Sequence, residues 1–450
     1  MKKLFVILIV VLIASLLIAP FFVGGVAENK FNEIIAQTES YNVSVSSRYA
    51  RSWFSSDAET TMRAGSSLLK NVPAQLQNGL AFVTGIVVRT THAINHGPFS
   101  FSDLGGHHSP IQPVIAAIHN TSTIILPHEL SNDSITLHTY ATINMNGSYD
   151  SYLDIPAASH SITADVPVTI QYDTLSASTH LSPDLKKTDY TLSIPSFFLR
   201  SDNGALAADR LSLSGSSQKG IFDLLFGSNH CEMSQLTIEN PSDSSTLQLS
   251  GFSFDMVSFE QNSSVALTTT TRLNSLLLDD VAYGPGAFTF AYRNVDAESL
   301  YKLQNIFTMF KNAQWDEQHV MANSFMLYSQ IMALLPQLLS KSPEVEIRDF
   351  SFVTPDGDFS GNVMIAVQGI TKDMVLTTAE IINALDATAT LSLPVAFVDT
   401  MQAGSESSPF MPFVALLEKK GDAYVLNARF SRGVLTVNDT IIPLPFGNLR

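Results

Sequence analysis

The stretch SITLHTYATINM, residues 134–145, alternates apolar and polar side chains along its length. Ile135, Leu137, Ala141 and Ile143 share one phase, and polar side chains fill most of the positions between them. Because successive side chains of a β-strand point to opposite faces, this period of two predicts a strand with one apolar and one polar face. Such strands are typical of antiparallel sheets that are covered on one side only.

The same period extends outward from this stretch over residues 134–293, and clusters of Gly, Asn, Asp and Ser separate the runs. Its phase reverses after Ser250-Gly251, which indicates a bend or a bulge there. A sheet of so many strands must curl or be covered. The pattern therefore predicts an α+β chain that is mainly β, with a large curved antiparallel meandering sheet and a few helices packed on it.

Helical periods follow the strands. Residues 297–310 carry an apolar stripe after Asp296, a suitable N-cap, and residues 319–339 are rich in Met and Leu. We interpret both as helices that pack on the sheet, with a kink or a new start at Pro336. Strands resume after residue 343, and residues 382–397 are expected to be a strand that ends at Pro394.

A charge-free run precedes the β pattern. Residues 4–27 read LFVILIVVLIASLLIAPFFVGGVA. As a helix this run would be about 36 Å long, against a hydrocarbon core of about 30 Å, so we predict a transmembrane helix. A cleaved signal peptide that ends at Ala27 is the alternative. Lys2 and Lys3 before the run predict a cytoplasmic N-terminus, with the bulk of the chain outside the cytoplasm.

The expected organisation has five parts. They are a transmembrane signal-anchor over residues 1–27, a stalk helix over 28–40, an antiparallel β region over 41–295, a helical hairpin over 296–342, and a C-terminal α+β region over 343–450 that continues the sheet. We interpret the aromatic residues of 49–54 as core packing.

Composition narrows the function. The net charge of −16 argues against nucleic-acid binding, which needs a basic surface. The chain has one cysteine and so no intrachain disulfide. It contains no GxSxG, P-loop, CxxC or HExxH motif. We therefore expect no catalytic residue, no cofactor and no metal site.

Two clusters contain residue types that could bind a metal or act as a nucleophile. Five histidines lie within 28 residues, and a metal site would need three or four of them to converge with carboxylates behind them: His92, His96, His107, His108 and His119. The triplet His230-Cys231-Glu232 puts a thiol beside an imidazole, but neighbours on a strand face opposite ways. We expect neither cluster to be functional.

Several short motifs resemble the YdgA-like family of membrane-anchored bacterial envelope proteins of unknown function. In chain order they include Tyr49, Arg51, Trp53, Phe54, Ser55 and Ser56; then His96, Gly97 and Pro98; then Gly284 and Pro285; and finally Asn438. The chain departs from the family's pattern at Ser52 and Asp439, where glycine is usual. The matches span residues 1–445.

The resemblance implies a single-pass protein of the bacterial inner membrane with a periplasmic body, and structural roles for these motif residues. The family also looks distantly similar to AsmA-like envelope proteins, whose strands form a long apolar groove. Such an analogy of architecture does not determine function.

Two functions are expected on this basis. One is a non-catalytic envelope protein that shelters lipid or another apolar ligand in a curved sheet. The other is a structural or interaction scaffold whose core is filled by its own helices. The expected partners are the bilayer, through residues 4–27, an apolar ligand, and a second copy or another envelope protein. The two hypotheses differ in whether the apolar face of the sheet is open or filled.

Overall fold

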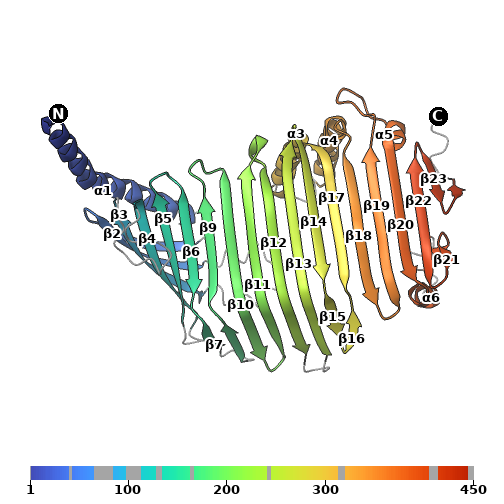
Figure 1. Cartoon of the computed structure of the whole chain (residues 1–450), viewed down its shortest axis with the longest axis horizontal. Coiled ribbons are helices and arrows are strands. Elements are labelled where there is room, and N and C mark those ends of the chain that lie inside the picture. The colour runs from blue at the N-terminus through green and yellow to red at the C-terminus, as the bar shows by residue number, and fades with distance from the viewer. Residues whose placement is uncertain are drawn as a thin grey trace. The chain divides into compact units, whose positions relative to one another are not determined.

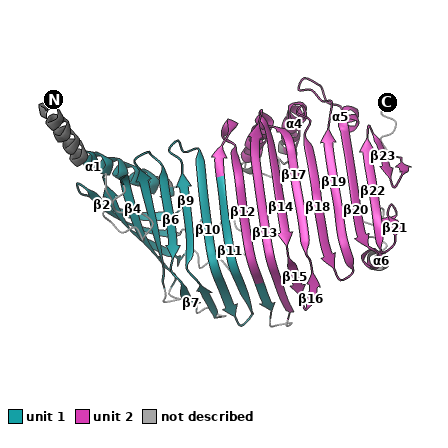
Figure 2. Ribbon diagram, in the orientation of Figure 1, with its two compact units in different colours: residues 1–216, 237–244 teal, residues 217–236, 245–450 magenta. Residues whose placement is uncertain are grey.

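The computed structural model describes residues 2–39, 43–64, 85–97, 113–127, 134–162, 167–240, 245–312, 320–404 and 414–443. The side chains of residues 2–18, 37, 39, 310–312, 320–323 and 401–404 lie outside this description. The described strands form one large, open, antiparallel sheet with few helices, so the chain is mainly β as predicted. The chain divides into two compact units, residues 1–216 with 237–244 and residues 217–236 with 245–450 (Figure 2).

Unit 1 begins as a meander in which each strand from β1 to β6 pairs with the next (Figure 1). The β7–β8 hairpin then interrupts the order, because β6 pairs with β9, and β10 pairs first with β9 and then with β8. The strands are β1 Val43–Arg51, β2 Ser55–Ala64, β3 Val87–His96, β4 Val114–Ile125, β5 Ser134–Asn144, β6 Tyr149–Ile155, β7 Ala158–Ile162, β8 Val168–Tyr172, β9 Leu175–Leu181, β10 Lys187–Ser201 and β11 Gly204–Lys219.

A single helix, α1 Lys2–Glu39, precedes these strands and runs through the expected boundary between anchor and stalk. Its Phe31 ring lies 5.2 Å from Tyr49 of β1 and 5.7 Å from His92 of β3. The residues expected to form a stalk therefore lie against the sheet. In the described part of the chain, no helix is both long and apolar enough to cross a membrane. Most side chains of the predicted anchor fall outside that part.

Unit 2 takes the rest of the strands. β13 pairs with β14 along one half and with β15 along the other. Gly251 at the junction has a φ of 61°, and Ser250 and Ser253 keep one continuous register, so the predicted irregularity is a bend without an inserted residue. The strands are β12 Leu225–Asn240, β13 Ser245–Gln261, β14 Ser264–Leu273, β15 Ser275–Leu278, β16 Val281–Tyr283, β17 Gly286–Asp296, β18 Glu344–Thr354, β19 Gly357–Val367, β20 Leu385–Pro394, β21 Glu418–Lys420, β22 Ala423–Ser431, β23 Val434–Val437 and β24 Thr440–Ile442.

Both predicted helices are present, as α3 Ala297–Asn312 and α4 Val320–Leu339, and α4 continues through Pro336. Asp296 caps α3, because its Oδ2 accepts hydrogen bonds from the Ser299 N–H and hydroxyl at 2.9 and 2.8 Å. Gln337 Nε2 of α4 donates to the same carboxylate oxygen at 3.1 Å. The cap of one helix thus also fixes the other.

The core of unit 2 lies where these helices meet the sheet. Leu224, Phe226, Val265 and Ala297 are buried together there. Both α3 and α4 contact β17, while the smaller helix α6 Val395–Gly404 contacts β20 and β22. The helices thus cover separate parts of the apolar face of this unit. The helical segments of the described residues also include η3 Ile221–Asp223 and α5 Thr378–Ala384.

Candidate functional site

The apolar face of unit 2 carries one aromatic or aliphatic side chain after another across neighbouring strands. The pairing register places Phe254, Thr271 and Phe288 in line across β13, β14 and β17. The same face continues on β19, β20 and β22 through Gly361, Leu391 and Leu426, which are paired with one another. The alternation predicted from the sequence therefore produces a continuous apolar surface within this unit.

A β-bulge in β18 adds an aromatic side chain to this surface. Arg348 and Asp349 together lie opposite Asn362 of β19. Asp349 has a φ of 56°, and its N–H donates to Asn362 Oδ1 at 3.1 Å. Because the extra residue shifts the alternation by one position, Ile347 and Phe350 both point to the apolar face.

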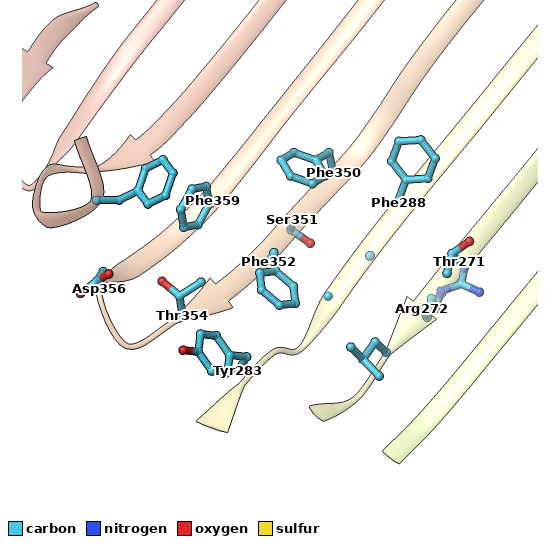
Figure 3. Close-up of a pocket in the computed structure, with 14 residues that line it drawn as sticks. Thr271, Arg272, Tyr283, Phe288, Phe350, Ser351, Phe352, Thr354, Asp356 and Phe359 are labelled. Carbon is cyan, nitrogen blue, oxygen red and sulfur yellow. The ribbon is translucent and has the colours of Figure 1, made fainter. Parts of the chain in front are cut away.

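A first cavity on this face has a volume of about 620 Å³. Figure 3 shows the rings of Phe288, Phe350 and Phe352 directed from adjacent strands toward the same space. Tyr283 stacks against Phe352 with ring centroids 6.4 Å apart, and Phe359 meets Phe397 of α6 edge to face at 4.8 Å. Six of the fourteen residues that line this cavity are thus aromatic.

The second cavity adjoins the first and has a volume of about 660 Å³. The two share Phe288, Phe350 and Phe397 in their walls, so they form one groove in two parts. The second part is lined further by aliphatic side chains of β18 to β20, α6, the turn after residue 413 and β22: Ile347, Val363, Ala389, Leu391, Leu393, Val398, Val414, Leu417 and Leu426. Both volumes fall in the range of small-molecule sites, about 300–1,000 Å³.

Little charge reaches the groove. Arg272 and Asp356 are the charged residues that line the first cavity, and none lines the second among the described residues. Arg272 follows Thr271 on β14 and so points to the opposite face, where its guanidinium donates to Asp255 Oδ2 at 3.3 Å. The groove accordingly offers mainly apolar contact.

Two of the sequence motifs support the groove. At Gly284-Pro285, the Gly284 N–H donates to the Val353 carbonyl at 2.7 Å, and the Val353 N–H donates to the Pro285 carbonyl at 3.1 Å. These bonds hold the segment that carries Tyr283. Asn438 has a φ of 44° in the β23–β24 turn, and its Nδ2 donates to the Leu416 carbonyl at 2.9 Å. That bond fixes the turn beside Leu417.

The other motif residues gather in unit 1, where α1 meets β1 to β3. Ser56 and His96 are buried, and Ser56 Oγ lies 3.1 Å from His96 Nε2. Arg51 pairs with Glu28 of α1 at 3.1 Å. Burial, with a smaller effect of the nearby Arg51 charge, lowers the pKa of His96. This buried contact joins β2 to the end of β3.

Four further motif residues lie near that contact in the sequence: Gly97, Trp53, Phe54 and Ser55. Gly97 has a φ of 119°, and an added Cβ there would lie 3.0 Å from Pro20 of α1. Trp53 and Phe54 occupy the β1–β2 turn and are about half exposed, so the interpretation of this aromatic cluster as core packing does not hold for them. Ser55 opens β2, and its carbonyl accepts from the Ser52 N–H at 2.8 Å. Pro98 lies outside the described residues.

The described histidines of the histidine-rich stretch, His92, His96 and His119, do not form a metal site. His92 lies 2.8 Å from Asn120 Oδ1 and 3.1 Å from the Thr60 hydroxyl, and burial lowers its pKa. His119 stacks on Tyr140 with ring centroids 4.7 Å apart. Within the described ranges no group of three or more His, Cys, Asp or Glu side chains could hold a metal ion. His107 and His108 fall outside those ranges.

The triplet at 230–232 is split by the strand, as expected. His230 Nδ1 lies 2.7 Å from Asp255 Oδ1, and this hydrogen bond raises the pKa of His230. Glu232 lies 3.7 Å from the other ring nitrogen. Both carboxylates therefore hold the imidazole on the outer face, and Cys231 is a partly exposed free thiol.

The groove itself could be predicted only in part. Alternation indicates an apolar face, whereas the bulge at Asp349 and the separate placement of the helices decide where that face stays open.

A comparison with curated proteins found no match, and neither did a comparison with solved structures. A family model described as "Bacterial protein of unknown function (DUF945)" matches residues 1–445. The chain therefore belongs to this family of bacterial proteins.

Proposed function

We propose that this chain is a non-catalytic, membrane-anchored envelope protein that shelters an apolar ligand, such as a lipid acyl chain, in the groove of unit 2. The observation that carries the proposal is the open aromatic and aliphatic groove between the parts of the sheet that helices cover. Each methylene buried there would contribute about 0.8 kcal/mol. The near absence of charge in the wall favours a hydrocarbon over a polar metabolite.

The sequence supports the cellular setting of this proposal. The charge-free run of residues 4–27 contains the anchor, with the N-terminus in the cytoplasm of the bacterial inner membrane and the body in the periplasm. The finer resemblance to YdgA-like proteins, and the more distant one to AsmA-like proteins, agrees with an envelope role. The excess of negative charge makes a nucleic-acid partner unsuitable.

The test is a search for bound lipid with a matched pair of variants. Full-length protein is purified in detergent, exchanged into an amphipathic polymer, denatured, and its bound lipids are identified by mass spectrometry. Ala389 lines the second cavity, so Ala389→Phe should fill it and reduce the recovered lipid. Thr388→Phe adds a phenyl ring to the opposite face of the same strand, where the Thr388 side chain is exposed. This variant should leave the amount of recovered lipid unchanged.

Two results would overturn the proposal. One is wild-type protein with no more lipid than a detergent-purified anchor of unrelated sequence. The other is equal loss of lipid in Ala389→Phe and Thr388→Phe, because that loss would come from altered folding or from lipid bound elsewhere.

A second candidate is an interaction scaffold, which exposed apolar side chains on α3 and α4 favour. Phe307 and Met309 of α3 and Phe325 and Tyr328 of α4 are all mostly exposed. Such residues suit contact with a second copy or with another envelope protein. Light scattering of the full chain, and of the Phe325→Ser variant, distinguishes the two: self-association that this variant abolishes supports the scaffold, and a lipid-loaded monomer supports the sheltering function.

A further inference from the structure

Aromatic side chains gather at the point where α1 meets the β1–β2 turn. Phe21 and Phe22 come from the helix, and Trp53 and Phe54 come from the turn. The Phe21 ring lies 6.0 Å from Phe22 and 5.1 Å from Trp53. Phe21, Phe22, Trp53 and Phe54 are 39, 66, 50 and 51% exposed, so these large rings form one accessible apolar patch.

The position of this patch on the fold is rigid. Pro20, the residue before Phe21, is buried and contacts Gly97. Gly24 lies so close to His96 that an added Cβ would approach its Cε1 atom to 2.7 Å. A helix held on both sides of Phe21 and Phe22 cannot rotate these two rings away, so their exposure is a fixed feature of unit 1.

The charge beside the patch is neutralised. The guanidinium of Arg51 stands over the Phe21 ring, 4.9 Å from its centroid, and pairs with Glu28 at 3.1 Å. The patch therefore presents apolar ring surface beside an arginine whose charge is already balanced by Glu28. Tryptophan, phenylalanine and arginine together are typical of surfaces at the level of lipid head groups.

The preceding sequence identifies the partner. Residues 4–19 contain no charged residue and lead directly into the docked part of α1. These 16 residues would span about 24 Å as a helix, which is less than the hydrocarbon thickness of about 30 Å. Because residues from Pro20 onward are held on the sheet, the segment left for the bilayer is short, and the mismatch would draw the patch into the interface.

We propose that Phe21, Phe22, Trp53 and Phe54 form a collar that inserts into the head-group region of the bilayer and seats the edge of unit 1 directly on the membrane. The collar leaves no room for a stalk between membrane and sheet. This inference rests on the proposed anchor and is independent of any ligand in the groove.

The experiment places Trp53 relative to the lipid. The chain has two tryptophans, so Trp315→Phe leaves Trp53 as the only one. Full-length Trp315→Phe protein is reconstituted into phosphatidylcholine vesicles with bromine atoms near the head groups or deep in the acyl chains. We expect strong quenching of Trp53 by the shallow bromines and weak quenching by the deep ones.

A second set of variants tests the collar as a unit. Replacing Phe22 and Phe54 by serine should reduce the shallow quenching toward that of water-exposed indole, because Trp53 loses its neighbours in the interface. Phe259 of β13, in unit 2, is about as exposed as Phe54, and Phe259→Ser should leave the quenching of Trp53 unchanged.

The outcomes distinguish failure of the proposed collar from failure of the proposed anchor. Protein that floats with vesicles while Trp53 remains unquenched overturns the collar and leaves the anchor in place. Protein that does not float overturns both. Trp53 that is shielded from aqueous acrylamide, yet unquenched by either brominated lipid, is covered by protein, and that result also overturns the collar.

Discussion

At the scale of single residues, the contact between His96 and Gly24 shows how the absence of a side chain at one position lets a helix pack closely on the sheet. The imidazole occupies the space that a Cβ at position 24 would need, and its Nε2 lies 3.1 Å from Ser56. His96 Nδ1 is buried and has no hydrogen-bond partner among the described residues. The sequence motif marked His96 but could not show its exposure, which depends on where α1 docks.

We expect Gly24→Ala to destabilise the protein by about 1–3 kcal/mol, since the new methyl group would overlap the His96 ring. Gly25→Ala is the matched control. Its methyl group would lie 3.0 Å from the flexible end of Arg51, and alanine also favours the helix, so its stability should match or exceed that of the wild type. Denaturant unfolding followed by circular dichroism measures both. Equal free energies of unfolding for the two variants would contradict the contact.

The lowered pKa of His96 predicts acid sensitivity of unit 1. In the folded chain, burial favours the neutral ring, so the unfolded chain takes up the proton first as pH falls. The free energy of unfolding should therefore decrease as pH drops below the usual histidine pKa of about 6.5. His96→Gln should make this decrease shallower when urea unfolding is measured over a pH series.

His230 supplies a control of opposite sign. Its pKa is raised by the hydrogen bond to Asp255, so its stabilising contribution is present at low pH and fades as pH rises through the raised value. His230→Gln should thus steepen the loss of stability on acidification. A His96→Gln variant with the pH profile of the wild type would be incompatible with a buried neutral imidazole.

At the scale of elements, alternation predicted the strands, whereas the helix α5 and the bulge in β18 were not predicted. The strand expected over residues 382–397 begins only at Leu385, because α5 Thr378–Ala384 precedes it. Thr377 and Glu380 form a capping box at the start of α5, and this Thr-x-x-Glu pattern is visible in the sequence. The bulge at Asp349 has no comparable signal, since it requires a positive φ that aspartate adopts only in some settings.

Asn438 shows how one turn residue supports a wall of the groove. We expect Asn438→Gly to retain the positive φ but to lose the side-chain bonds to Leu416 and to the Asn427 N–H, at a cost of about 1–3 kcal/mol. Asn427→Ala is the control. It keeps every backbone group that Asn438 contacts, and it should lower the free energy of unfolding far less. Thermal unfolding of the two variants provides the comparison, and a wild-type midpoint for Asn438→Gly would rule out this role.

At the scale of the whole molecule, charge and apolar surface act on the membrane in opposite directions. Anionic lipid should repel a chain of net charge −16, whereas the proposed anchor and the proposed collar would favour hydrocarbon. The sequence could predict this balance, because it depends on composition. The open part of the sheet could not be predicted, because it depends on which strands the helices contact.

We therefore expect flotation of the full chain to weaken as the fraction of anionic lipid rises, and salt to restore it by screening the repulsion, whereas flotation with uncharged lipid should be insensitive to salt. Centrifugation of vesicles with graded phosphatidylglycerol content, at low and high sodium chloride, measures this. Flotation that increases with anionic lipid and disappears at high salt would instead indicate binding through a basic surface.

The division of the chain at β11 and β12 has a consequence for its synthesis. The polypeptide enters unit 2 at residue 217, returns to unit 1 for residues 237–244, and leaves again. Unit 1 is therefore incomplete until residue 244 has emerged from the ribosome, and by then residues 217–236 are already exposed without the rest of their own unit. A nascent chain arrested shortly before residue 237 would carry an unfinished edge strand, and that stage of growth is where a chaperone has most to protect.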